Sequence, residues 1–127
     1  MRTDDLYLVD MVEAAQAIES FVGQETVDRF VRDAVTCSAV LWKLMIVGEA
    51  ATKLSAETKA LFTDIPWDQI RGLRNRMVHG YFTLDWSTLW DLVTTAIPAL
   101  REQAERALAA QFPETYRRLQ ERRADGS

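Results

Sequence analysis

The sequence predicts an all-α fold, an up-and-down bundle of four main helices with a short extra helix and a C-terminal helical tail. Two observations predict this class. Apolar residues recur at spacings of three and four along most of the chain, and no segment alternates apolar and polar residues as a half-buried strand does. A length of 127 residues leaves room for one domain, with a core at about 4–112 and a tail at 113–127.

The N-terminal half predicts two helices. The first begins after Thr3, a good N-cap residue, and ends at Gly23, which can stop the last turn. A long second helix is expected from residue 26 or 27 to Leu54, because its apolar residues recur without a proline. These residues cover much of its circumference, so this helix needs packing partners on several sides.

The C-terminal half begins with a short helix expected at 57–62. Pro66 suits the first turn of the next helix, which is expected to run from about Trp67 to Val78 and to be broken by Gly80. A last main helix follows.

Asp85 can cap that last main helix at its N-terminus. Pro98 lacks an amide donor and is expected to kink the helix. Its apolar residues fall on one face: Leu89, Trp90, Val93, Ile97 and Leu100.

Composition is that of an ordinary globular domain, with 48% hydrophobic and 27% charged residues. No apolar run is expected to approach the roughly 18 residues of a membrane span, and the acidic start at Asp4 and Asp5 does not fit a signal peptide. We therefore expect a cytoplasmic protein with no membrane association.

Few side chains are available for metal or redox chemistry. The single cysteine, Cys37, cannot form an intrachain disulfide and is expected to be a small buried residue on a helix. A single histidine leaves no zinc ligand set within one chain, and no cofactor is expected.

The net charge of −4, from 15 basic and 19 acidic side chains, argues against a surface that grips nucleic acid as a whole. Any RNA must be held locally. One basic cluster comprises Arg71, Arg74 and Arg76. A second cluster lies in the tail among glutamates and is expected to be a solvated, fraying helix: Arg117, Arg118, Arg122 and Arg123.

The segment from Leu73 to Phe82 carries the strongest indication of chemistry. It holds the only histidine, His79, close to Arg74 and Tyr81. Histidine transfers protons near neutral pH, and arginine supplies a fixed positive charge that suits phosphate. Together they suggest phosphodiester chemistry.

Helical geometry separates the faces of this segment. At about 100° per residue, Ile70, Leu73 and Met77 form a core stripe. Asn75 and His79, four residues apart, then project nearly opposite that stripe. His79 is therefore expected to face solvent or a second subunit.

The arginines are expected around that polar face. Arg71 leans towards it, and Arg74 and Arg76 lie on its two flanks, where Arg74 could reach a phosphate near His79. Alternatives remain: Arg74 could form a surface salt bridge with Glu49, Asn75 could cap a neighbouring helix, and Arg76 could be a solvated charge. The four tryptophans are expected in the core and not as nucleobase platforms: Trp42, Trp67, Trp86 and Trp90.

The chain resembles the HepT toxins of the HEPN superfamily of ribonucleases and nucleotide-binding helical proteins. The resemblance covers roughly Asp4 to Leu100, with the R-x4-H-x-Y signature as Arg74, His79 and Tyr81. Its flanking matches are Gly48-Glu49-Ala50-Ala51, Ile65-Pro66-Trp67, Ile70, Gly72-Leu73, Asp85 and Leu89-Trp90. It implies a single HEPN-like domain over residues 1–127.

This resemblance also implies an activity. HEPN ribonucleases place R-x4-6-H motifs in a cleft between two subunits and cut RNA without metal. We therefore expect Arg74, Asn75 and His79 to be catalytic in a homodimer, with Arg71 and Arg76 binding the RNA substrate. Acid and base roles need two groups, and each chain supplies one imidazole.

HepT toxins are typically encoded beside an MntA-type nucleotidyltransferase antitoxin that transfers AMP to the tyrosine of this signature, here Tyr81. Such a partner would block the cleft with bulk and negative charge. Two other readings remain: a non-catalytic HEPN module that binds nucleotide or its nucleotidyltransferase partner, and a purely structural helical adaptor.

Overall fold

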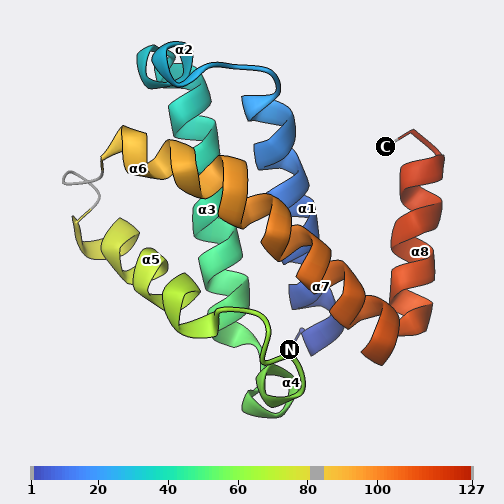
Figure 1. The fold of residues 1–127 in the computed structure, drawn as a ribbon. Helices are drawn as coiled ribbons and strands as arrows, with labels where there is room; N and C mark the ends of the chain where they lie inside the picture. Colours follow the sequence, from blue (N-terminus) through green and yellow to red (C-terminus); the bar gives the residue numbers. More distant parts are fainter. Residues whose placement is uncertain (1, 81–84, 127) are drawn as a thin grey trace.

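The computed structural model describes residues 2–80 and 85–126, and every regular element of this part is a helix (Figure 1). This confirms the predicted all-α class. The elements in chain order are α1 (Asp4–Val22), α2 (Val27–Arg32), α3 (Ala34–Lys53), α4 (Ala56–Leu61), α5 (Trp67–Gly80), α6 (Trp86–Asp91), the π-helical segment η2 (Leu92–Ala96), α7 (Ile97–Gln111) and α8 (Pro113–Ala124).

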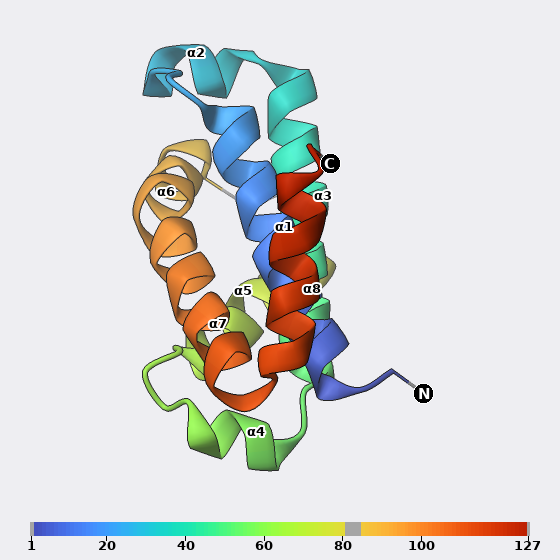
Figure 2. The same cartoon turned by 90° about the vertical axis from the view of Figure 1, so that its right-hand side faces the viewer.

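Helix α1 lies at the centre of the packing. It pairs with α3 on one side and with α7 on the other, and α5 packs on α3 (Figures 1 and 2). The innermost side chains come from α1, α3, η2 and α7 and are fully or almost fully buried: Leu8, Met11, Ile18, Val40, Leu44, Val93 and Leu108. The site-bearing helix α5 is thus placed by α3, which is placed in turn by α1.

The prediction of a single long helix up to Leu54 is wrong, because the helix is interrupted at Asp33. Asp33 leaves the helical region at φ −96° and ψ 91°, and its carboxylate accepts from the Thr36 amide at 3.0 Å and the Thr36 hydroxyl at 2.7 Å. An aspartate that caps a new helix in this way starts α3 afresh. Thr26 caps α2 by accepting from the Arg29 amide at 3.3 Å.

Helix α3 is more apolar than expected. This helix has 20 residues, and its most apolar window of 18 residues has a mean hydropathy of 1.5. It is long and apolar enough for a membrane span by length and composition alone, so the expectation that no run approaches this is wrong. In the fold α3 packs between α1 and α5, yet only 39% of its most apolar window is buried. Cys37 is buried as predicted, and burial raises the pKa of its thiol.

Three of the four tryptophans pack against the core, as predicted, and Trp42 does not. Trp67, Trp86 and Trp90 are partly buried, with the Phe30 ring 5.3 Å from that of Trp90. Trp42 on α3 is 66% exposed and lines an open hollow with Tyr7 and Asp10 of α1.

The last main helix runs from α6 through η2 into α7. Asp85 caps it as predicted by accepting from the Ser87 amide at 3.0 Å. A kink was predicted at Pro98, and the structure has a π-helical turn just before it, over Leu92–Ala96. The Ile97 amide donates a hydrogen bond to the Leu92 carbonyl, five residues earlier. Pro98 has no amide to continue the ordinary four-residue pattern.

Helix α8 is docked along α1 and α7, so the expectation of a fraying tail is wrong (Figure 2). Leu119 is 2% exposed. Arg123 pairs with Glu105 at 2.6 Å, and the Thr115 hydroxyl donates to Asp5 at 2.6 Å. The charges of this helix can be seen in the sequence, but its acidic partners on α1 and α7 become apparent only in the folded chain.

The crossing of α3 and α5 is close because Gly48 has no side chain. A Cβ atom at Gly48 would lie 2.6 Å from Cβ and 2.9 Å from Cγ of Arg74. These atoms are the fixed base of the arginine side chain, so they cannot simply swing away. Gly48 therefore sets how near Arg74 lies to α3.

We predict that Gly48→Ala lowers the free energy of unfolding by about 1–3 kcal/mol, because α5 must move outward to admit the methyl group. Gly72→Ala is the matched control within α5, where a Cβ atom meets nothing within 4 Å. It should raise stability by up to about 1 kcal/mol through helix propensity. Urea denaturation measures both, and equal stability of the two variants would contradict the crossing argument.

Candidate active site

The N-terminus of α5 is anchored by Trp67. Its indole nitrogen donates to the Lys59 carbonyl at 3.2 Å and to the Phe62 carbonyl at 3.0 Å. Ile70 and Met77 are then buried at 7% and 6% exposure. With the partly buried Leu73 they form the predicted core stripe.

The opposite face of α5 is exposed. Asn75 and His79 are both exposed, and between them Val78 is 44% exposed. The imidazole of His79 forms no hydrogen bond or ion pair with residues 2–80 or 85–126. The prediction that His79 faces away from the core is confirmed, and its ring is accessible to a substrate or a second chain.

Arg74 is held at the edge of this face by two partners. Its Nε donates to Oε1 of Glu49 at 2.7 Å, and one terminal nitrogen donates to Oδ1 of Asn75 at 3.2 Å. Arg74 and Glu49 are 29% and 39% exposed, so the pair is only partly screened by solvent. The anticipated Glu49 salt bridge is therefore present, and it orients the guanidinium.

This arrangement leaves hydrogen-bond donors pointing outward. A guanidinium has five N–H donors, of which the described contacts use two, leaving three for a phosphate. The Asn75 oxygen accepts from Arg74, so the amide nitrogen of Asn75 is turned away and can donate as well. The capping role considered for Asn75 is not what the structure records.

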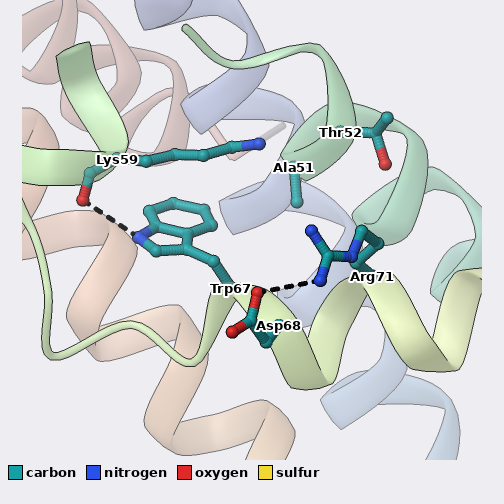
Figure 3. A pocket seen from close by; sticks show the side chains of 6 residues that line it. All are labelled: Ala51, Thr52, Lys59, Trp67, Asp68 and Arg71. Atoms are coloured by element: carbon teal, nitrogen blue, oxygen red, sulfur yellow. Dashed lines mark hydrogen bonds and ion pairs between the residues drawn. The ribbon is translucent and has the colours of Figure 1, made fainter. Parts of the chain in front are cut away.

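Arg71 and Arg76 lie on different flanks of α5 and are not brought together. Arg71 pairs with Asp68 at 3.1 Å beside a hollow of about 320 Å³ that reaches α3 and α4 (Figure 3). Arg76 lines a hollow of about 470 Å³ towards α6, together with Asp85 and Leu89.

Gly80 is the last residue of α5, in line with the predicted end of this helix, and Tyr81 lies outside the described residues. Among the described residues, no three His, Cys, Asp or Glu side chains are grouped as metal ligands. Two residues important for this region were not assigned a role from sequence. Gly48 is one residue of the family-like segment Gly48-Glu49-Ala50-Ala51, and nothing in the sequence around Lys59 indicates a role for it.

The tail arginines face carboxylates. Arg117 pairs with Glu114 and Glu121, and Arg122 lies 3.4 Å from Glu13. These pairs offset the positive charge of α8.

The family model described as Ribonuclease HepT-like matches residues 11–107. A protein named "Probable ribonuclease HepT" from Thermococcus cleftensis is 35% identical over 100 residues, covering 79% of this chain and 91% of the relative. A "Putative RNase" of Methanocaldococcus jannaschii is 29% identical over 99 residues, covering 78% and 91%. Another, from Caldanaerobacter subterraneus, is 29% identical over 108 residues, covering 85% and 96%.

No solved structure matches this chain. The family model spans α5 with Arg74 and His79, together with the Gly48 crossing that positions them. The chain therefore belongs to the HepT-like ribonuclease family, as its R-x4-H-x-Y segment predicted.

Proposed function

We propose that two copies of this chain form a metal-independent endoribonuclease that cleaves RNA in a cleft between their α5 helices. The observation that carries the proposal is the exposed His79 on the polar face of α5, with an arginine at the edge of that face oriented by Glu49 and Asn75. This pairs a proton-transfer group with a fixed cation, as phosphodiester cleavage requires.

In the proposed reaction, the 2′ hydroxyl of RNA attacks the adjacent phosphorus and the 5′ oxygen of the next nucleotide leaves. One His79 takes the proton of the attacking hydroxyl, and the His79 of the second copy protonates the leaving oxygen. Arg74 and the Asn75 amide bind the charged phosphate oxygens as the phosphorane forms. The products are a 2′,3′-cyclic phosphate and a 5′ hydroxyl.

The apolar surface next to the site supports the two-chain arrangement. Trp42 is 66% exposed, and the partly exposed Met45 and Ile46 share its hollow with Glu49, the partner of Arg74. Val78 on α5 is also exposed, at 44%. An exposed apolar patch of this kind indicates an interaction surface, and in the proposed dimer a second copy covers it.

We further propose that the enzyme is the cytoplasmic toxin of a toxin–antitoxin pair, neutralised when an MntA-like nucleotidyltransferase transfers AMP to Tyr81. Membership of the family supports this regulation. Tyr81 follows His79 by two residues, so an adenylate there would place bulk and negative charge against Arg74.

His79→Ala should lower RNA cleavage by at least about 100-fold, because a proton-transfer group is lost. Arg74→Lys should lower it by about tenfold, because an ammonium cannot make two parallel bonds to a phosphate. Arg32→Lys on α2 is the control and should keep full activity. Cleavage is measured in excess chelator with the cyclic-phosphate end identified by mass spectrometry. RNA binding without cleavage by the wild type would favour the non-catalytic module instead.

Trp42→Ser should raise the dimer dissociation constant by at least about tenfold and reduce cleavage in parallel, because a large ring at the proposed interface is lost. Leu61→Ser is the control, since Leu61 is 59% exposed on α4, away from Trp42. Analytical ultracentrifugation at assay concentration gives the oligomeric state. Full activity of a monomer would rule out the shared cleft.

Tyr81→Phe should remain toxic when co-expressed with the neighbouring nucleotidyltransferase, whereas the wild type should be silenced and gain the mass of one or more adenylates. Growth assays and peptide mass spectrometry report the two effects. Neutralisation of Tyr81→Phe as complete as that of the wild type would show that control does not need this hydroxyl.

A further inference from the structure

A hollow with two cationic side chains lies between α5, α3 and α4, one to two turns before Arg74 along α5. Three elements line it: Ala51 and Thr52 from α3, Lys59 from α4, and Trp67, Asp68 and Arg71 from α5 (Figure 3). Its volume is about 320 Å³.

Lys59 is positioned in this hollow by the Trp67 ring. The Lys59 ammonium lies 5.9 Å from the ring centroid, and the indole nitrogen donates to the Lys59 carbonyl at 3.2 Å (Figure 3). Asp4 holds α4 in place by accepting from the Ser55 hydroxyl at 2.6 Å and the Thr58 hydroxyl at 2.5 Å. Within the described part of the chain Lys59 forms no ion pair within 4.0 Å, and its charge acts only through space on the Asp4 carboxylate. A phosphate in the hollow could therefore bind the ammonium directly.

Arg71 is only weakly committed to its own chain. It pairs with Asp68 at 3.1 Å, but the two side chains are 67% and 90% exposed. Solvent-exposed pairs of this kind contribute little to stability, whereas a guanidinium can make two charge-assisted bonds to a phosphate. A phosphate between Arg71 and Lys59 can therefore displace Asp68.

We propose that Lys59 and Arg71 form a subsite for a backbone phosphate of the RNA strand, beyond the phosphate that is cleaved. This rests on the proposed ribonuclease function. Arg71, Asn75 and His79 recur every four residues on the exposed side of α5, so Arg71 lies about 12 Å along the helix from His79. A strand lying along α5 would reach the hollow roughly two nucleotides from the cut.

The chemistry of the hollow favours the backbone over a base. Lys59 and Arg71 supply charges that suit a phosphate. Lys59 lies over the face of Trp67, so the ring positions the lysine and does not offer a stacking platform. The subsite should therefore add affinity without sequence preference.

The first test compares cleavage of an RNA octanucleotide with that of a dinucleotide. Lys59→Gln and Arg71→Gln should each lower the ratio of octanucleotide to dinucleotide kcat/KM by about tenfold, since only the longer strand reaches the hollow. Arg32→Gln makes the same charge change on α2, at the other end of the bundle (Figure 1), and should leave this ratio unchanged.

The second test measures RNA binding without cleavage, in the His79→Ala background. The slope of log Kd against log salt should fall by about 0.7 for each cation removed, as for any phosphate contact on a single strand. A single-stranded DNA octanucleotide should show the same change, because the contact does not read the sugar. Thermal denaturation of each variant confirms that the fold is intact.

Two results would overturn the subsite: equal loss of octanucleotide and dinucleotide cleavage, or an unchanged salt slope in both Lys59→Gln and Arg71→Gln. If the wild type cleaves neither RNA but Lys59→Gln still lowers the salt slope of RNA binding, the ribonuclease proposal is wrong and the phosphate site is supported.

Discussion

The close crossing of α3 and α5 at Gly48 determines where the arginine of the signature can reach. The Arg74 stem packs where a side chain on Gly48 would be, and its head is bonded to Glu49, the next residue of α3. One turn of α3 therefore controls both the depth and the direction of the guanidinium. Since α3 is fixed by its packing on α1, the geometry of an exposed site depends on the buried core.

The periodicity of apolar residues predicted which face of α5 is exposed, but it predicted only some of the contacts that α5 makes with α3. The spacing of Ile70 and Met77 was sufficient to place His79 on the exposed face, because a helix has one geometry. Spacing could suggest Glu49 as a partner of Arg74, but it could not reveal that a methyl group on Gly48 would collide with Arg74. That contact joins residues 26 positions apart and exists only after the two helices meet.

The remaining differences also have physical causes. A run of apolar residues does not reveal that Asp33 within it caps a new helix. The apolar character of Trp42 does not reveal whether residues of its own chain bury the ring. Glutamates within the tail suggested a solvated helix, although Leu119 and Arg123 secure it against distant elements. In each case the polarity of the residue can be seen in the sequence, whereas the residue it contacts in the folded chain cannot.

The docking of α8 has a consequence for how the molecule can be handled. Its last described residues lie on the side of the bundle away from α5, in both views (Figures 1 and 2). A fluorophore, surface linker or fused protein attached after this helix would therefore lie on the side of the bundle opposite α5. The chain could thus be immobilised or reported on from its C-terminal side with the polar face of α5 open to solution.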